Sequence, residues 1–293
     1  MDNIFGGLEK FGLNMEDMGD LFSEEKPEEK EKKEETAAVE TPKSVDDMDE
    51  AELLFQRELT CTVCDHKFKA LSVRSSKLRR LSPDKDLRPR YKGVDTLKYD
   101  VYSCPYCGYT GMARYFDHLS PLQIRLIRDG VCSKFNSSLL DVPETYDYDV
   151  ALERYKLSLY NTVVKKGSIS EKAYTCLKMS WLCRGKIEEL LEKGASKDSE
   201  TIKRCEKEEL SYYAQAFEGL IKAVASESFP ICGMDQNTMY ILIAQMAIKL
   251  EKYDVASKLV SRILVSKTAP RAIKDRALDL KQEIITILRG TAQ

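Results

Sequence analysis

The sequence predicts an α+β, mostly α protein in which a small β module is followed by an antiparallel helical array. Three observations lead to this prediction. Two Cys-x-x-Cys pairs lie close to strand-like stretches in the N-terminal half, the chain after residue 150 has helical periodicity almost throughout, and the first 50 residues are strongly acidic. We therefore expect four parts in the 293 residues: a short amphipathic segment at 1–22, a disordered acidic linker at 23–50, the β module at 51–145 and the helical domain at 146–293.

Composition excludes several classes of protein. With 43% hydrophobic and 32% charged residues, the chain is neither collagenous, nor fully disordered, nor a disulfide-dense miniprotein. The longest apolar run, Met239 to Leu250, is interrupted by Gln245 and Lys249, so we expect no membrane span. The N-terminus has no basic region and no continuous apolar stretch, which predicts no secretory signal and a cytoplasmic location.

The small net charge of −2 conceals a strong asymmetry along the chain. Residues 1–50 hold 17 Asp and Glu against 6 Lys and Arg, a net of −11, so the rest of the chain carries +9. From Ser23 to Asp49 large apolar residues are almost lacking, and such a stretch cannot bury enough surface to offset its ordering entropy. A disordered linker is predicted, with a solvated single helix over Glu24 to Glu35 as the alternative.

Ahead of the linker, six apolar residues recur at alternating spacings of four and three, which places them on one helical face. They are Ile4, Leu8, Phe11, Met15, Met18 and Phe22. Four glycines in the same segment each cost roughly 0.5–1 kcal/mol relative to Ala in a helix, so the segment needs a groove in order to fold. We expect it to dock on a partner or on the protein's own body; a membrane-surface helix and simple disorder are the alternatives.

The two cysteine pairs are the sharpest chemical signal. Cys61-Thr62-Val63-Cys64 and Cys104-Pro105-Tyr106-Cys107-Gly108 each place two thiolates on one tight knuckle, and two knuckles complete a tetrahedral shell of four sulfurs. Strand-like stretches at 67–71 and 97–102 flank the knuckles and indicate a zinc-ribbon layout with a long insertion. We predict one structural zinc ion bound by Cys61, Cys64, Cys104 and Cys107; iron in the same ligands is the less favoured metal.

The other cysteines and both histidines have less specific roles. Nine cysteines in a reducing compartment indicate thiols or metal ligands rather than disulfides, and we expect the five outside the pairs to be unreactive. His66 and His118 are expected near the surface, because four cysteines already complete the shell. A redox role is the alternative for Cys104 and Cys107, since Cys-Pro-Tyr-Cys resembles the glutaredoxin motif, but here the motif precedes Gly108 rather than a helix.

The insertion between the knuckles is basic. Residues 65–98 hold 11 Lys and Arg against 4 Asp and Glu, a net of +7. A basic loop that carries a tyrosine on a zinc ribbon can bind nucleic acid through phosphate contacts. The candidate nucleic-acid-binding residues are Arg74, Lys77, Arg79, Arg80, Arg88, Arg90 and Lys92. The alternative is a solvated loop whose arginines pair with Asp84, Asp86 or Asp95, or with the acidic N-terminal residues.

The C-terminal half predicts six helices with clear start and stop signals. Ser168 with Glu171 three residues later forms a capping box, Gly194 is a stop signal, and Pro270 suits a first helical turn. The helix over Asn237 to Leu250 is apolar nearly all round, so we expect it to be central. The six predicted helices cover about 150–167, 168–191, 199–226, 237–250, 254–266 and 270–290.

A weak repeat signature lies within these helices. Small residues at Ala244 and Ala256, with Tyr240 and Tyr253 ahead of them, match packing positions of a tetratricopeptide unit. We therefore expect a tetratricopeptide-like helical array. A generic helical bundle is the alternative, because any close helix pair needs small residues facing large ones.

The ordered series of motifs resembles a known family. The Cys61 pair, Val73 to Leu78, Asp84 to Tyr91 and the run from Tyr99 through the Cys104 pair to Tyr109, followed by helices with Trp181, are similar to the bacterial family catalogued as domain of unknown function 2225. The resemblance covers about residues 55 to 290. It implies a zinc-ribbon-like part joined to tetratricopeptide-like helices in a bacterial cytosolic protein, and it implies no activity.

The motifs of common enzymes are lacking. No P-loop, dinucleotide fingerprint, H-E-x-x-H or G-x-S-x-G occurs, so an enzyme is the less favoured interpretation. We expect a non-catalytic zinc-binding adaptor that binds an unknown protein partner through its helical array. One alternative is a nucleic-acid-binding zinc-ribbon protein that uses the insertion 67–98, and a weaker one is a thiol oxidoreductase at Cys104 and Cys107.

Overall fold

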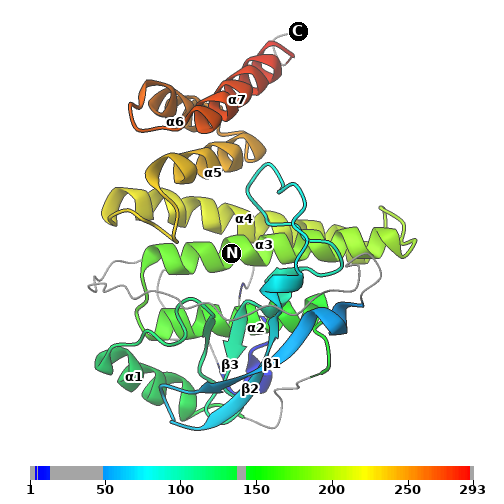
Figure 1. Cartoon of the computed structure of the whole chain (residues 1–293), viewed down its shortest axis with the longest axis vertical. Helices are drawn as coiled ribbons and strands as arrows, with labels where there is room; N and C mark the ends of the chain where they lie inside the picture. Colours follow the sequence, from blue (N-terminus) through cyan, green and yellow to red (C-terminus); the bar gives the residue numbers. More distant parts are fainter. Residues whose placement is uncertain (1–3, 5, 14–48, 137–142, 291–293) are drawn as a thin grey trace.

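The computed structural model describes residues 4, 6–13, 49–136 and 143–290. Two β-hairpins and a short helix lie at one end of the molecule, and six longer helices are stacked from there towards the C-terminus (Figure 1). This confirms the predicted fold class of a mostly helical chain with small two-stranded sheets near the cysteine pairs. The acidic linker predicted at 23–50 falls almost wholly outside the described residues.

Each β-hairpin is built around one cysteine pair. Strands β1 (Leu54–Thr60) and β2 (Lys67–Val73) pair antiparallel, with Leu54 opposite Val73. Strands β3 (Val101–Ser103) and β4 (Thr110–Met112) form the second, shorter hairpin. The cysteines therefore lie in the turns that close the two hairpins.

The second hairpin begins later than its sequence pattern predicts. Alternation over 97–102 predicts one continuous strand, whereas Thr96–Tyr99 forms a 3-10 helix, η5, and only then does β3 start. The cause is local, because the Asp95 side chain accepts a hydrogen bond from the Leu97 N–H and starts a helical turn. Leu97, Lys98 and Tyr99 are all buried, so this segment packs inside the molecule without extended backbone.

The helices after the β module follow the predicted order. Capping side chains of Asp147, Ser168, Ser199 and Asp235 mark four of their starts. Their bounds are α2 Tyr148–Val164, α3 Ile169–Glu192, α4 Glu200–Ser226, α5 Gln236–Lys249, α6 Tyr253–Val265 and α7 Arg271–Gly290. Among the described residues the structure adds α1 (Pro121–Ile127), which the sequence analysis missed although Ser120 and Gln123 form a capping box around Pro121.

Consecutive helices pack against one another, and their short connections make neighbours antiparallel. Helix α2 lies against β3 and β4, so it joins the helical array to the β module. Helix α5 is buried along nearly its whole length, which confirms that it is central. Ala244 and Ala256 are fully buried where α5 and α6 meet, while the repeat type stays a prediction. No helix in the described ranges is long and apolar enough to cross a bilayer.

The described part of the N-terminal segment lies on the body of the protein. Leu8, Phe11 and Leu13 belong to the main hydrophobic core, and a 3-10 turn over Glu9–Phe11 ends at Gly12, whose φ is +78°. The Phe11 ring stacks on Phe135 with centroids 5.9 Å apart. Of the six predicted apolar positions, Met15, Met18 and Phe22 lie outside the described residues.

Candidate metal centre

The four cysteines of the two pairs converge on one point. The Sγ atoms of Cys61 and Cys107 are 3.6 Å apart, as are those of Cys64 and Cys104, and all four lie within 4.8 Å of one another. Four sulfurs at about 2.3 Å from one zinc ion in a tetrahedron are about 3.8 Å apart. The cluster could therefore hold a metal ion with little rearrangement.

The two knuckles share one backbone design. In each, the residue four positions after the first cysteine donates its N–H to that cysteine's carbonyl, from Asp65 to Cys61 at 2.8 Å and from Gly108 to Cys104 at 3.0 Å. These two donors have left-handed backbones, with φ of +60° and +75°. Aspartate and glycine are both among the residues that tolerate this conformation. The local sequence thus turns both thiols of each pair to the same side.

A turn far along the chain secures both knuckles. Arg128 donates two hydrogen bonds to the Val63 carbonyl, from Nε at 2.9 Å and from Nη2 at 2.6 Å. The Phe135 ring covers the second knuckle so closely that a Cβ placed on Gly108 would lie 2.4 Å from it. From α2, Asn161 Nδ2 donates to the Gly108 carbonyl at 3.3 Å. Sequence reasoning missed these residues, because nothing in the cysteine spacing points to them.

The thiols perturb one another electrostatically. The neighbouring Cys104 thiol and burial raise the pKa of Cys61 to about 12, and Cys107 together with burial raises the pKa of Cys104 to about 12. Burial would also raise the pKa of Cys64, but hydrogen bonds from the His66 backbone and its neighbours lower it to about 7. Without a cation the four thiols cannot all ionise, whereas a bound divalent metal ion removes that obstacle.

The remaining cysteines and the histidines lie outside the ligand group. Cys176, Cys183, Cys205 and Cys232 are buried, whereas Cys132 is half-buried beside Cys107 at the end of the π-helical turn η6 (Arg128–Cys132). His66 is exposed and stacks on Tyr106 from the other knuckle, with centroids 4.6 Å apart. His118 is also exposed, and neither histidine joins the metal-capable group found in the described chain.

The family model for an uncharacterised protein conserved in bacteria, DUF2225, matches residues 54–284. The chain belongs to this family. The match contains both knuckles of the metal centre and ends within α7, and it leaves out the acidic N-terminal residues. Neither the curated proteins nor the solved structures give a match.

In this DUF2225 member the predicted basic residues do not form one surface. Arg88 is 3% exposed and donates to Glu188 at 3.1 Å and to Asp95 at 3.2 Å. Arg90 donates to Glu188 at 2.9 Å and to Asp84 at 3.3 Å. Two of the predicted phosphate ligands are therefore engaged with carboxylates of α3 and of the insertion itself.

The other five predicted basic residues are nearer the solvent. Arg74 is exposed and donates from Nε to the Leu54 carbonyl at 3.0 Å, with its guanidinium over the Phe55 ring. Arg79 and Arg80 are exposed, while Lys77 and Lys92 are half-buried.

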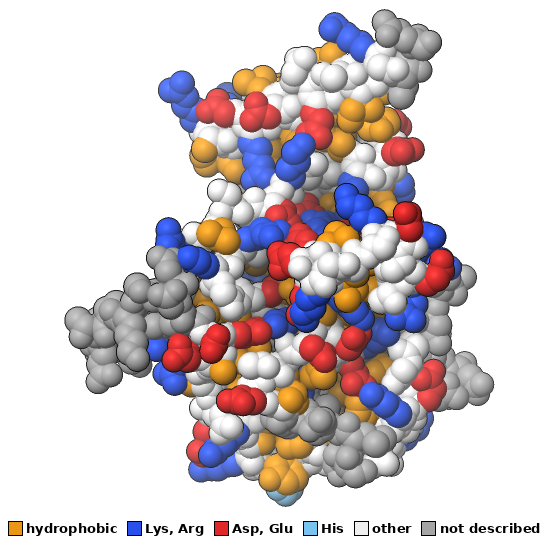
Figure 2. Space-filling view, turned by 90° about the vertical axis from the view of Figure 1, so that its right-hand side faces the viewer, with side chains coloured by type: hydrophobic (Ala, Val, Ile, Leu, Met, Phe, Trp, Pro, Cys, Tyr) orange, Lys and Arg blue, Asp and Glu red, His pale blue; other side chains and the backbone are white. Residues whose placement is uncertain are grey.

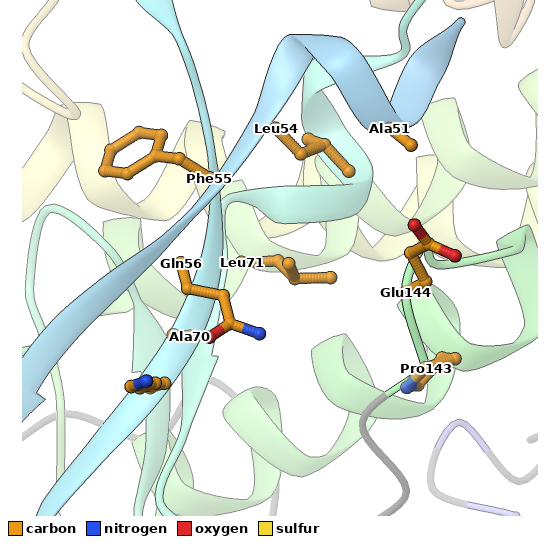
Figure 3. A pocket seen from close by; sticks show the side chains of 9 residues that line it. Ala51, Leu54, Phe55, Gln56, Ala70, Leu71, Pro143 and Glu144 are labelled. Atoms are coloured by element: carbon orange, nitrogen blue, oxygen red, sulfur yellow. The ribbon is translucent and has the colours of Figure 1, made fainter.

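A shallow pocket lies apart from the metal centre on the first hairpin. Its walls are side chains of β1 and β2 on one side and of Pro143 and Glu144 on the other (Figure 3), and its volume is about 330 Å³. Its lining residues are Ala51, Leu54, Phe55, Gln56, Lys69, Ala70, Leu71, Pro143 and Glu144. It contains none of the four cysteines.

Proposed function

We propose that this DUF2225 member is a non-catalytic adaptor in which one zinc ion organises the β module and the helical array binds a protein segment. The observation that carries the proposal is the convergence of four thiols, contributed by two separate hairpins, within 4.8 Å of one another. A closed shell of four sulfurs has no open position for substrate or water, which suits a structural role and not a catalytic one.

Zinc is the metal that best fits this donor set. Four thiolates in a tetrahedron are typical of structural zinc sites, and iron bound by the same ligands is the alternative. The ion would hold Cys61 and Cys64 of the first hairpin against Cys104 and Cys107 of the second. The two hairpins form separate two-stranded sheets, so the metal would cross-link them in addition to the buried contact between the Ser72 and Tyr102 hydroxyls at 3.1 Å.

The adaptor role is supported by the stacked helices. Arrays of this kind present long surfaces to protein segments, and such a surface requires no catalytic group. Arg88 and Arg90 already bind carboxylates, which favours protein binding over nucleic-acid binding by the insertion. The thiol oxidoreductase alternative is less favoured because Cys104 and Cys107 lie in a hairpin turn with two further thiols beside them.

Elemental analysis of the full chain, purified without added metal, tests the metal centre. We expect about one zinc ion per chain, and we expect Cys104→Ser to abolish it with loss of the signals of the β module in circular dichroism. Cys183→Ser is the matched control, because that thiol is buried in α3 away from the cluster. Metal-free, fully folded protein with a reducible Cys104–Cys107 bond would overturn the zinc proposal and favour the oxidoreductase.

Affinity capture with the full chain tests the adaptor role against nucleic-acid binding. We expect a protein partner that is retained after nuclease treatment and at moderate salt. Recovery of nucleic acid with an affinity that falls steeply as salt rises would contradict the adaptor proposal, since that dependence reflects counterion release from phosphates.

A further inference from the structure

Strand β1 has a strand partner on one side only. It pairs with β2, and the two strands form a sheet of two. At one end of the pairing the Arg74 N–H donates to the Leu53 carbonyl at 2.8 Å. At the other end the Cys61 N–H donates to the His66 carbonyl at 3.0 Å. Because hydrogen bonding alternates along an antiparallel pair, the odd-numbered residues of β1 bond to β2, and the even-numbered ones turn their N–H and C=O groups to the outer edge.

The outward backbone groups of β1 are unused. Gln56, Glu58 and Thr60 are exposed, and their N–H and C=O groups make no hydrogen bond with any residue that the structure describes. The edge is closed only at its start, where the Leu54 carbonyl accepts from the Arg74 Nε at 3.0 Å. An open edge of this kind is a template for pairing with another extended chain, and a sheet of two strands gains stability from a third.

The shallow pocket on the first hairpin adjoins this edge. Figure 3 shows the side chains of Leu54, Gln56 and Leu71 pointing towards the opposite wall at residues 143–144. Leu54 and Leu71 are buried, so the floor of the pocket is apolar, and its volume of about 330 Å³ has room for a large apolar side chain. On a strand added to β1, the residue opposite Gln56 lies on the same face as Gln56 and therefore beside the pocket.

The charged residues of the edge have a fixed order. Arg57 and Glu58 lie on opposite faces of β1, because successive side chains alternate. Glu58 has Lys67 of β2 at 3.7 Å, whereas Arg57 lies opposite Ala70 and pairs with no described carboxylate. An added strand would complement both charges with an acidic side chain opposite Arg57 and a basic one opposite Glu58.

The wider surface gives no preference for one sign of charge. Figure 2 shows Lys and Arg side chains interspersed with Asp and Glu over the side of the molecule that it presents. Long-range attraction by a field of one sign is therefore weak there, and the local order of charges along the edge is left to select the partner.

A second copy of β1 does not supply this order. Antiparallel pairing of two outer edges sets even-numbered residues opposite even-numbered ones and odd opposite odd. Arg57 would then face Phe55, Arg57 or Leu59 of the other copy and never its Glu58. Charge complementarity thus favours a different protein as the partner.

We propose that the outer edge of β1 binds an extended segment of a partner protein in antiparallel register. The segment places an apolar side chain in the pocket opposite Gln56, an acidic one opposite Arg57 and a basic one opposite Glu58. In the N-to-C direction it therefore reads basic, acidic, apolar. Backbone bonds supply the affinity, while the pocket and the charges supply the specificity. The site belongs to the β module, so it stands or fails independently of binding by the helical array.

The test of backbone pairing uses the full chain and a synthetic peptide, Thr-Val-Lys-Glu-Leu-Thr-Val, labelled for fluorescence anisotropy. Its leucine takes the place opposite Gln56. An N-methyl group on this leucine should weaken binding at least about tenfold, because its N–H donates to the Gln56 carbonyl in the complex. An N-methyl group on the glutamate is the matched control, since that N–H points away from β1. Equal affinities of the two methylated peptides would overturn the proposal.

Exchange of the two charges tests their order. We expect Arg57→Glu/Glu58→Lys protein to bind the peptide at least about tenfold more weakly than unmodified protein, and the peptide with its lysine and glutamate exchanged to restore the affinity. Both residues are exposed, so the variant should fold. Glu200→Lys/Lys203→Glu, which exchanges an exposed ion pair of α4, is the control and should bind as the unmodified chain does. An unchanged affinity, or a loss that the exchanged peptide does not restore, contradicts the proposal.

Amide hydrogen exchange locates the bound peptide without any variant. Saturating peptide should protect the amides of Gln56 and Glu58, which face the open edge, and leave that of Arg57 unchanged, because it already bonds to β2. Protection confined to other parts of the chain, or no binding at roughly 1 mM peptide, would show that the edge is not a binding site.

Discussion

Single residues determine how the metal centre is shaped, and Gly108 illustrates this most clearly. Its φ of +75° is costly for residues with a side chain, and the Phe135 ring occupies the space where a Cβ would lie. Gly194 has a similar φ of +87°, but nothing lies within 4 Å of the position of its Cβ. Comparing alanine substitutions at Gly108 and Gly194 therefore separates the cost of backbone strain from the cost of the clash with Phe135.

We expect Gly108→Ala to lower the free energy of unfolding by about 3 kcal/mol, as strain and displacement of the Phe135 ring add, while Gly194→Ala costs about 1 kcal/mol. Urea unfolding of both variants measures the difference, and zinc content should fall in Gly108→Ala alone. Equal losses in the two variants would mean that Phe135 does not press on the knuckle.

Asp86 contributes to stability in a pH-dependent manner. Burial would raise its pKa, but the Arg184 guanidinium holds the pKa below the ordinary 3.8. The ionised carboxylate therefore stabilises the fold fully above pH 3.8, and this contribution is lost as the pH falls through the lower folded value. We expect Asp86→Asn to cost about 2 kcal/mol at pH 7, since charge-assisted hydrogen bonds to Arg184 and Trp181 are weakened.

Paired urea titrations of the unmodified and Asp86→Asn proteins check this prediction. The difference in unfolding free energy should stay constant between pH 7 and pH 5 and shrink below pH 3.8. Metal release at low pH affects both proteins, so it cancels in the difference. A difference that grows as the pH falls would contradict the assigned sign.

At the scale of elements, the turn at 128–136 connects the metal centre to the N-terminal segment. Arg128 binds the first knuckle, Phe135 covers the second, and the Asn136 N–H donates to the Phe11 carbonyl at 3.2 Å. Lys156 of α2 donates to the Gly6 carbonyl at 3.0 Å from the other side. Docking of residues 6–13 thus depends on a turn that the cysteine knuckles hold in place.

We expect Phe11→Ala to detach this segment, because the variant removes a fully buried ring worth about 3 kcal/mol. Limited proteolysis should cleave the variant within residues 6–13 much faster than the unmodified protein, with zinc content unchanged. Leu122→Ala, at a residue that is 61% exposed, is the control and should leave the cleavage rate unaltered. Equal rates for Phe11→Ala and the unmodified chain would contradict the docking.

The helices and strands also differ in how clearly the sequence predicts them. The long helices were predictable because caps such as Ser168 and Ser199 and the apolar periodicity agree with each other. Helix α1 has a capping box but spans only 7 residues, too few for periodicity to be recognised. Residues 96–99 became a 3-10 helix because one hydrogen bond, donated by the Leu97 N–H to the Asp95 side chain, outweighed the alternation.

At the scale of the whole molecule, the β module and the helices share one core. Cys61 and Cys107 belong to the same hydrophobic cluster as α2 residues such as Tyr155 and Leu159. A smaller cluster, which includes Leu53, Leu71 and Tyr99, joins the first hairpin to η5. Loss of the metal ion should therefore weaken the whole chain and not the β module alone.

We expect a chelator to lower the unfolding temperature by roughly 10 °C in a single transition, because the thiols lose their shared cation while the common core still unfolds as one unit. Differential scanning calorimetry with and without the chelator measures this. The Cys104→Ser variant should start at the lower temperature and show no further response. Two separate transitions would show that the module and the helices unfold independently.

The sequence by itself determined the features that depend on neighbours along the chain. The spacing of Cys61 with Cys64 and of Cys104 with Cys107, with Asp65 and Gly108 after them, contains the whole local design of the two knuckles. The helices and their caps are likewise local. These features follow from backbone conformation and periodicity, which a few adjacent residues decide.

Only the tertiary structure decided which distant groups meet. It brought Arg128 and Phe135 to the knuckles, and it turned Asp86 and Arg88 from a predicted basic loop into partners of α3. Net charge along the insertion could not reveal this, because Arg88 and Arg90 both donate to Glu188, which lies about 100 residues further along the chain. Burial makes an unpaired charge costly, so packing of the insertion against the helices determined where its charges lie.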